Sequence, residues 1–190
     1  MKNLTDQELI FQFTNGNSKA LEALIYRHKD KLLTSIYLLV KDRYLAEDIM
    51  QDVFVKVIDK LNTGKYTDEG KFFPWLMRIS YNLCMDHFRK TKSMPVIRMN
   101  DGSDIFETLD FAEPSPEQAM SSTQTRDRVR IMLDRLPADQ REVIILRHYA
   151  NLSFKEIARL CQCNINTALG RMRYGLLNLR KMMVEKQISF

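Results

Sequence analysis

Apolar residues recur at helical spacing along most of the chain, and no alternating apolar and polar pattern of the kind typical of β-strands persists. The clearest stretch covers residues 20–40, and similar spacing predicts helices over residues 46–61 and 72–90. Within residues 20–40 the apolar side chains at this spacing are Leu21, Leu24, Ile25, Leu32, Ile36 and Leu39. The segments "NGNS", "KDRY" and "NTGKYTDEGK" between the helices have the composition of turns and loops.

Local signals predict where several helices begin. Thr5 and Glu8 form a T-x-x-E capping box, in which the two residues satisfy each other's free N–H groups, and this pair opens a first helix. Ser153 and Glu156 repeat the motif near the C-terminus. Pro74 falls in the first turn of its helix, where a proline is tolerated.

The helical pattern disappears from Ser93 to about Gln124. This segment holds three of the five prolines, and residues 92–124 carry 2 Lys and Arg against 6 Asp and Glu. Such a composition indicates an extended acidic linker. The expected fold is therefore all-α, with two small helical domains, residues 1–92 and 125–190, joined by an acidic flexible linker over residues 93–124.

Helices resume near Arg126, and Leu136-Pro137 marks a fresh start. Ser153 then opens a short helix, and Asn164 is a good N-cap for the next one. In that last helix Ala168, Met172, Gly175 and Leu179 fall on one stripe that we expect to be buried. This pattern predicts a helix-turn-helix, whose second helix lies in a DNA major groove. The alternative is an ordinary helical hairpin with a solvated basic face.

The residues off the buried stripe and near the start of this helix are the candidates for contacting DNA: Asn166, Thr167, Gly170, Arg171 and Arg173. The charge distribution supports an anionic partner for this half. The chain has a net charge of +5, and residues 125–190 hold 13 Lys and Arg against 6 Asp and Glu.

The N-terminal half carries two further surfaces. Glu47, Asp48, Gln51 and Asp52 form an acidic helix face, which suits a basic protein unless it is merely solvated. In the following helix Arg78, Asn82, Arg89 and Lys90 lie downstream of Tyr66, Phe72, Phe73 and Trp75. Aromatic rings interleaved with cations suit unstacked single-stranded bases. The alternative is that Phe73, Trp75 and Ile79 belong to the core.

Several classes of chemistry have little support in the sequence. Cys161 and Cys163 lack a second ligand pair at zinc spacing, and Asp86-His87 lacks a matching acid or histidine, so we expect no metal, cofactor or catalytic site. The polar start and the short apolar runs predict neither a signal peptide nor a membrane span. Sparse cysteines fit a reducing cytosol, so a cytoplasmic location is expected.

Taken in order, these segments resemble the sigma-70 family of bacterial RNA polymerase sigma factors, in particular the extracytoplasmic-function group. "LAEDIMQDVF" is similar to the family's core-binding helix, and "FPWLMRISYNLCMDHFRK" to its promoter-melting helix. The segment from "LPADQREVII" to "GLLNLRK" is similar to the fourth sigma domain. One departure concerns Leu169 and Gly170, where the family often has Lys and Ser.

The resemblance implies a role for each surface. The acidic face would bind the coiled coil of the largest polymerase subunit, and the polymerase flap is a further implied contact. The −10 element would be held by Asn62, Thr63, Lys65, Tyr66, Lys71, Phe72, Arg78, Asn82, Arg89 and Lys90. The −35 element would be held by Ser153, Lys155, Asn166, Thr167, Gly170, Arg171 and Arg173.

The resemblance therefore implies a sigma factor that binds core RNA polymerase and promoter DNA and has no catalytic activity of its own. An anti-sigma factor is a further implied partner. A stand-alone helix-turn-helix regulator of duplex DNA is the main alternative, and a small helical enzyme using Asp86 and His87 is another. The regulator would not need the acidic face, the aromatic loop or strand opening, and the enzyme would show turnover.

Overall fold

The computed structural model describes residues 4–67, 70–91 and 129–185, and within these ranges every regular element is a helix. The all-α fold predicted from the periodicity is confirmed. The chain divides into two compact units, one formed mainly by residues up to 96 and the other mainly by residues from 97 onward. The predicted linker and both predicted domain boundaries lie outside the described residues.

The first unit begins with α1 (Asp6–Thr14), which starts at the predicted capping box. The Thr5 N–H donates to Glu8 Oε2 at 2.7 Å, and the Glu8 N–H donates to Thr5 Oγ1 at 3.3 Å. After a turn comes α2 (Ser18–Val40), which ends at Lys41 because that residue has a φ of 59°. The helix start predicted at Thr5 and the turn predicted between the first two helices are therefore both present.

The third helix begins earlier than its apolar pattern predicts, because α3 covers Arg43–Asn62. Asp42 explains the difference, since its side chain accepts a hydrogen bond from the Leu45 N–H at 3.0 Å and caps the helix. Tyr44, expected in a break, is consequently helical. The last helix of this unit, α4 (Phe72–Thr91), agrees with its prediction.

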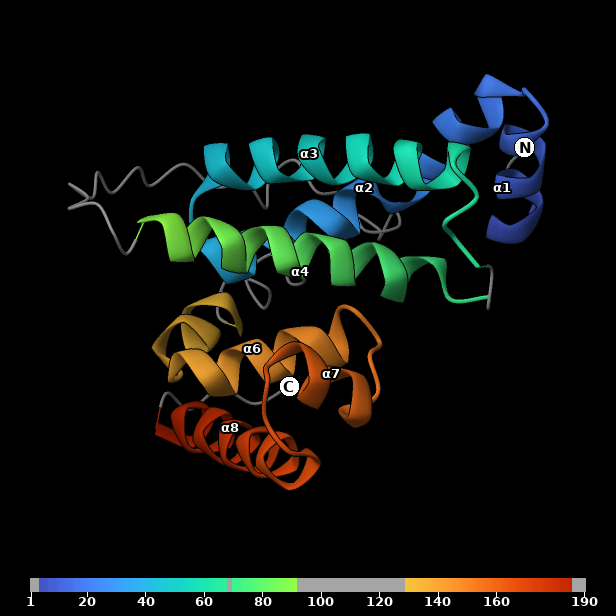
Figure 1. Cartoon of the computed structure of the whole chain (residues 1–190). Helices are drawn as coiled ribbons and strands as arrows, with labels where there is room; N and C mark the ends of the chain where they lie inside the picture. Colours follow the sequence, from blue (N-terminus) through green and yellow to red (C-terminus); the bar gives the residue numbers. More distant parts are fainter. Residues whose placement is uncertain (1–3, 68–69, 92–128, 186–190) are drawn as a thin grey trace, which may run out of the picture. The chain divides into compact units, whose positions relative to one another are not determined.

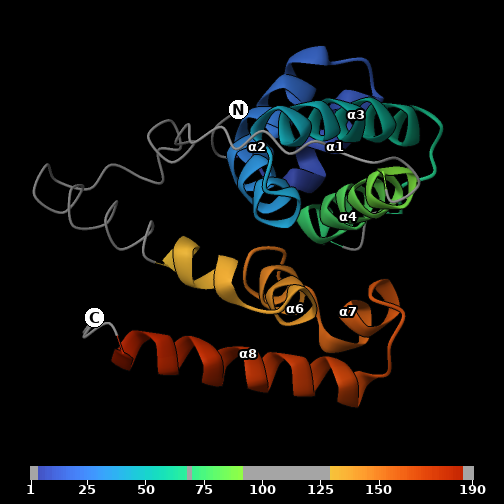
Figure 2. The same ribbon diagram turned by 90° about the vertical axis from the view of Figure 1, so that its left-hand side faces the viewer.

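Three helices of the first unit, α2, α3 and α4, lie lengthwise beside one another, and α1 packs at one end of them (Figures 1 and 2). The buried apolar stripes of all four helices form one core. Its most deeply buried side chains are Leu9, Leu24, Leu32, Ile36, Ala46, Val53, Leu76 and Met77. This packing leaves the opposite face of α3 exposed, whereas on α4 only Asn82, Arg89 and Lys90 are exposed.

The second unit contains a helical stretch at residues 129–135, then α6 (Ala138–His148), α7 (Phe154–Leu160) and α8 (Ile165–Glu185). The predicted capping box opens α7, because the Ser153 N–H donates to Glu156 Oε2 at 2.7 Å. These helices pack pairwise, with α8 against both α6 and α7.

The helix-turn-helix geometry predicted for the second unit is present in α7 and α8. Asn164 caps α8, since its Oδ1 accepts from the Thr167 N–H at 2.7 Å. The predicted stripe on α8 faces α6 and α7: Ala168 is fully buried, Met172 is 9% exposed and Gly175 is buried. Leu179, at the end of the stripe, is only half-buried.

The two glycines of α8 differ in what surrounds them. A Cβ added at Gly175 would lie 2.8 Å from Ile144 Cδ1 and 3.4 Å from Gln140 Cβ, so α6 fills the space that a side chain would need. A Cβ added at Gly170 would meet nothing within 4 Å. Packing therefore accounts for Gly175 but gives no reason for Gly170.

We expect Gly175→Ala to gain less stability than a glycine-to-alanine change at an open helix position. Alanine gains roughly 1 kcal/mol over glycine inside a helix, but at Gly175 the added Cβ forces the terminal methyl of Ile144 to shift, and overpacking opposes the gain. Gly170→Ala is the matched control, and it should raise stability by about 1 kcal/mol because it gains propensity without a clash. Thermal unfolding followed by circular dichroism measures both, and equal melting temperatures would contradict the packing argument.

Candidate functional site

The acidic face predicted on α3 is exposed to solvent. Asp48, Gln51 and Asp52 are exposed, and Glu47 is half-exposed with its Oε1 3.1 Å from Arg43 Nε. The apolar residues on the other side of the helix are buried, with Ala46 and Val53 fully covered. Burial of that stripe fixes the rotation of α3, so the carboxylates must point outward.

Two exposed apolar residues share this face, and the pattern-based reading missed them. Tyr44 is 67% exposed and Val55 is 66% exposed. Together with Asp48 and Gln51 they lie at spacings of four, three and four residues, which places them on one side of a helix. This spacing is the signal in the sequence from which Tyr44 and Val55 could have been assigned to the acidic face. We call the six residues Tyr44, Glu47, Asp48, Gln51, Asp52 and Val55 the α3 surface.

Aromatic rings gather where the loop at residues 62–71 meets α4. The ring centroids of Tyr66 and Trp75 are 4.5 Å apart, and those of Phe72 and Trp75 are 5.8 Å apart. The Tyr66 and Phe72 rings meet edge to face at 5.9 Å. We call Tyr66, Phe72, Phe73 and Trp75 the aromatic cluster.

The members of the aromatic cluster differ in their access to solvent. Phe72 is 4% exposed and Phe73 is 8% exposed, so both rings belong to the core. Phe72 was predicted to contact DNA, but its ring is not at the surface. Tyr66 and Trp75 are half-buried and remain the members that can offer a face to a base. The alternative, that these aromatic residues belong to the core, is therefore correct for Phe73 and only partly correct for Trp75.

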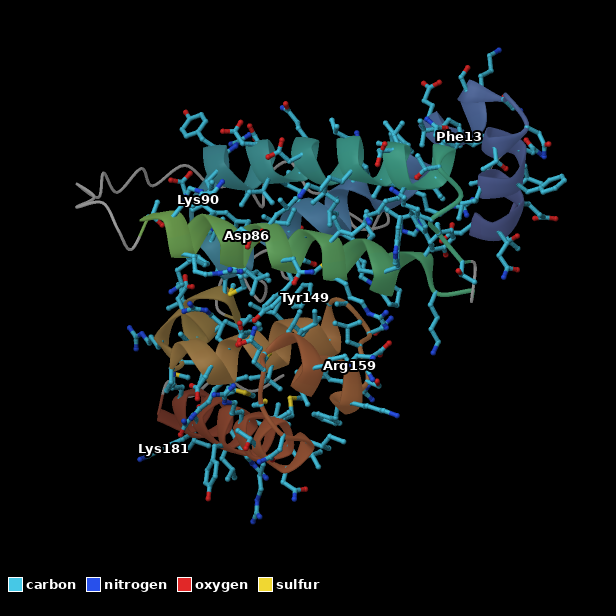
Figure 3. The ribbon with its side chains drawn as sticks, in the orientation of Figure 1. Phe13, Asp86, Lys90, Tyr149, Arg159 and Lys181 are labelled. Atoms are coloured by element: carbon cyan, nitrogen blue, oxygen red, sulfur yellow. The ribbon has the colours of Figure 1, made fainter. Side chains whose placement is uncertain are left out.

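The polar residues predicted beside the cluster differ in their exposure to solvent and in their partners. Asn62, Thr63, Lys65, Lys71 and Asn82 are exposed, although the Thr63 hydroxyl donates to the Asp59 carbonyl at 2.8 Å. Arg78 is half-buried. Farther along α4, Lys90 is exposed, and Arg89 Nη2 lies 2.7 Å from Asp86 Oδ1 (Figure 3). Cations therefore follow the loop and the exposed side of α4.

A polar clamp joins α1 to α2, and the sequence reading missed it. Asp6 Oδ1 lies 2.6 Å from Arg27 Nη1, and Asp6 Oδ2 lies 2.8 Å from His28 Nε2. Burial of the Asp6 carboxyl opposes its ionisation, but the hydrogen bonds and charges of His28 and Arg27 outweigh that effect and hold its pKa below the usual 3.8. Asp6 is therefore ionised at neutral pH.

This lowered pKa predicts an acid-sensitive contribution to stability. The folded-state pKa lies below the unfolded one, so the contribution is complete above about pH 4 and is lost as the pH falls through the folded value. Asp6→Asn should therefore be about 1 kcal/mol less stable than the parent at pH 7, and the difference should be smaller at pH 3. Urea unfolding at both pH values measures this, with Glu22→Gln as the exposed control. A difference that is the same at both pH values would contradict the assignment.

In the second unit, the residues predicted to contact the −35 element lie around the start of α7 and along α8. Lys155, Asn166 and Arg173 are exposed. Thr167 donates its hydroxyl to Asn164 Oδ1 at 3.0 Å, and Ser153 is occupied by the capping box. Their polar side chains thus also have local structural roles.

Arg171 differs from Arg173 because it contacts another helix. Its Nε lies 3.2 Å from Asp139 Oδ2 in α6, and its side chain is 27% exposed. One edge of the guanidinium is therefore directed at Asp139. Leu169, where the family pattern departs, is 43% exposed and so does not simply pack in the core.

Two of the groups that suggested other chemistry are Cys84 and Asp86, and the structure shows the surroundings of both. Cys84 is buried, and burial raises the pKa of its thiol to about 12, which leaves it unreactive at neutral pH. Asp86 is paired with Arg89. In the part of the chain that the structure describes, no three His, Cys, Asp or Glu side chains are grouped to hold a metal.

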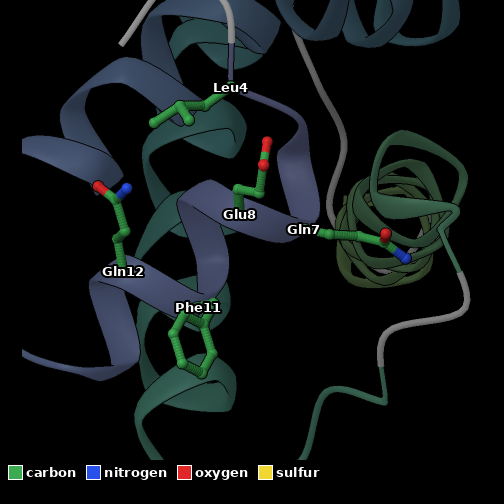
Figure 4. A pocket seen from close by; sticks show the side chains of 5 residues that line it. All are labelled: Leu4, Gln7, Glu8, Phe11 and Gln12. Atoms are coloured by element: carbon green, nitrogen blue, oxygen red, sulfur yellow. The ribbon is translucent and has the colours of Figure 1, made fainter.

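A shallow hollow lies on α1, and its only ionisable lining residue, Glu8, belongs to the capping box (Figure 4). It is lined by Leu4, Gln7, Glu8, Phe11 and Gln12. Among the described helices, none is long and apolar enough to cross a membrane.

Two family models match the chain, each over one of the units described above. The model for sigma-70 region 2 matches residues 24–94, and the model for sigma-70 region 4 matches residues 126–171. The chain belongs to the sigma-70 family of RNA polymerase sigma factors. As a sigma factor, it binds core RNA polymerase and directs transcription initiation at promoters.

Relatives place this sigma factor in the extracytoplasmic-function group. It is 29% identical over 175 residues to RNA polymerase sigma-H factor of Pseudomonas aeruginosa, with 88% of each chain covered. It is also 29% identical over 180 residues to ECF RNA polymerase sigma-E factor of Escherichia coli, with 90% of each covered. The solved sigma factor RpoE of Bartonella quintana, in complex with the anti-sigma factor NepR, has a similar fold: the TM-score is 0.61 at 20% identity, covering 87% of this chain and 97% of that one.

Proposed function

We propose that this sigma factor divides its work among three surfaces: the α3 surface binds core polymerase, the aromatic cluster with α4 holds the opened −10 strand, and α7 with α8 binds the −35 duplex. The observation that carries the proposal is the exposure of a carboxylate face on α3 in a protein that is otherwise basic. The factor itself has no catalytic activity and works in the cytoplasm, where RNA polymerase acts.

The α3 surface is suited to a basic protein partner. Its carboxylates would meet lysine and arginine side chains of the largest polymerase subunit, and their complementary charge would steer and orient the encounter. Tyr44 and Val55 flank the carboxylates and are large and exposed, which is typical of residues that anchor an interface. We therefore add them to the acidic residues predicted to bind core polymerase.

The region around the aromatic cluster is suited to single-stranded DNA. Tyr66 and Trp75 each offer part of a ring, on which an unstacked base can pack with little dependence on its identity. Lys65, Lys71 and Lys90 provide cations along the path of the backbone. A base flipped from the −10 element would therefore be held by the loop, while α4 follows the strand.

The start of α8 is suited to duplex DNA. Asn166 and Arg173 are exposed where a recognition helix reads base edges, and Lys155 is positioned for a phosphate. Gly170 has open space above it, so its lack of a side chain would let the helix approach the DNA closely. Leu169 is exposed beside these residues and would contact a thymine methyl group.

An anti-sigma factor is a further proposed partner. Exposed apolar side chains on α8, including Ile165, Leu176 and Leu177, exceed what contact with a phosphate backbone requires. Apolar patches of this kind mark protein interaction sites. The similar fold of a sigma factor solved with an anti-sigma factor supports the same proposal.

Transcription in vitro tests the proposed function. Core polymerase lacking a sigma factor is incubated with this protein and a library of randomised promoter fragments, and the transcripts are sequenced. We expect transcripts that depend on the protein and share upstream motifs at −10 and −35. Transcripts identical to those made by core polymerase alone would contradict the proposal.

A further inference from the structure

The N-terminal helix α1 lies before residue 24, where the family match begins, yet its contacts lead to the aromatic cluster. We propose that Asp6 and His28 are positioning residues for promoter opening, because they hold the cluster in the arrangement that receives unstacked bases. This inference rests on the proposed role of the cluster in binding the −10 strand. It assigns α1 a part in strand opening without any contact between α1 and DNA.

The first step in the argument is the attachment of His28. Its Nε2 lies 2.8 Å from Asp6 Oδ2, and its side chain is only 13% exposed. Arg27 strengthens the attachment, since Nη1 donates to Asp6 Oδ1 at 2.6 Å and Nη2 donates to the Leu4 carbonyl at 2.7 Å. A hydrogen bond to one ring nitrogen fixes the orientation of a buried imidazole.

The second step is the contact between His28 and the buried half of the cluster. The imidazole centroid is 5.4 Å from that of Phe72 and 5.5 Å from that of Phe73. Phe72 in turn contacts both Tyr66 and Trp75, at centroid distances of 5.9 Å and 5.8 Å. A continuous series of rings therefore runs from the Asp6 carboxylate to the two half-buried rings that face solvent.

A second contact joins α1 to the same loop. A Cβ built on Gly70 would lie 3.4 Å from Gln7 Nε2, so the Gln7 side chain reaches the end of the loop that precedes α4. In Figure 4 this side chain leaves α1 in a different direction from Phe11. Gly70 has a φ of 68°, a conformation that favours glycine. Helix α1 is thus next to the loop at Gly70 and connected to Tyr66 through His28.

These contacts have a consequence for DNA binding. A stacking surface that is already ordered loses less conformational entropy when a base arrives, so it binds and retains the base better. Without the clamp, Phe72 loses one of its ring neighbours, and Tyr66 and Trp75 are then less well fixed. The defect should affect strand opening and leave duplex binding by α8 unchanged.

Fluorescence of the free protein tests the positioning directly, because Trp75 is the only tryptophan in the chain. The variants are Asp6→Ala and His28→Ala, with Glu22→Ala as a control that removes an exposed carboxylate from α2. We expect a red-shifted emission and stronger acrylamide quenching in both variants and no change in the control. Asp6→Asn should lie between them and the parent, because its amide oxygen can still accept the hydrogen bond from His28.

Strand opening by the holoenzyme is the second measurement. The probe is a promoter selected from the randomised library by the parent holoenzyme, with 2-aminopurine in its −10 element. We expect Asp6→Ala and His28→Ala to slow opening about tenfold, equivalent to roughly 1.4 kcal/mol. Affinity for the closed promoter at low temperature should stay within about twofold, equivalent to roughly 0.4 kcal/mol.

The two measurements separate the inference from the function on which it rests. Unchanged Trp75 fluorescence in a folded His28→Ala protein would overturn the positioning role itself. Altered fluorescence with normal opening would instead overturn the assignment of the cluster to the −10 strand. If His28→Ala does not fold, as judged by circular dichroism, Asp6→Ala and its partial rescue by Asp6→Asn decide the same question.

Discussion

Reversing two charges on α3, with Asp48→Lys and Asp52→Lys together, should abolish binding to core RNA polymerase. Both side chains are exposed, so the fold should tolerate the change within about 0.5 kcal/mol. Placing like charges against each other across an interface costs several kcal/mol, so the affinity should fall by at least about a hundredfold. Binding to immobilised core polymerase by surface plasmon resonance gives both the rate and the affinity.

A matched control separates this effect from a general change of charge. Glu22→Lys on α2 changes the net charge by the same amount as Asp48→Lys alone, at an exposed position on a different helix. It should bind core polymerase as the parent does. Equal losses in Glu22→Lys and Asp48→Lys would show that net charge alone matters, and the α3 surface would then be only a solvated helix face.

The Arg171→Ala variant should weaken binding to a −35 duplex taken from a selected promoter. If the guanidinium reads a guanine, the cost should be about 1–3 kcal/mol and confined to one position of the site. If it contacts only phosphate, the loss should be uniform across sequences and the salt dependence should fall by about one unit. Titrations at several salt concentrations, monitored by fluorescence anisotropy, distinguish the two modes.

Arg180→Ala is the control for this prediction, since it removes the same charge from the exposed surface of the same helix. Asp139 provides a second comparison, because it lies 3.2 Å from Arg171 Nε and partly neutralises it. Asp139→Asn removes that negative charge and should strengthen duplex binding at low salt. If the Arg171→Ala variant binds the duplex no more weakly than the Arg180→Ala variant does, a specific role for Arg171 would be contradicted.

Much of the fold could be predicted because its determinants are local. The capping boxes at Thr5 and Ser153 and the N-cap at Asn164 act over three residues, and the structure contains all of them. The start of α3 was misplaced because Asp42 lies outside the apolar pattern that was used to find the helix. Capping residues therefore set helix starts more accurately than periodicity does.

The contacts around the candidate sites were less predictable because they join residues far apart in the sequence. His28 meets Asp6 across 22 positions, and Arg171 meets Asp139 from another helix. Neither pair produces a periodic pattern in the sequence from which the contact could be predicted. The burial of Phe72 could not be foreseen for a similar reason, since several adjacent aromatic residues compete for the core and only tertiary packing decides which of them enter it.

The most direct test of the central claim is a sizing-column experiment with purified protein and core RNA polymerase that lacks a sigma factor. The account predicts that the two elute together in stoichiometric amounts and that Asp48→Lys with Asp52→Lys elutes separately. If the parent protein elutes alone yet still binds duplex DNA, the chain would act as a stand-alone regulator, and the proposed role of the α3 surface would be wrong.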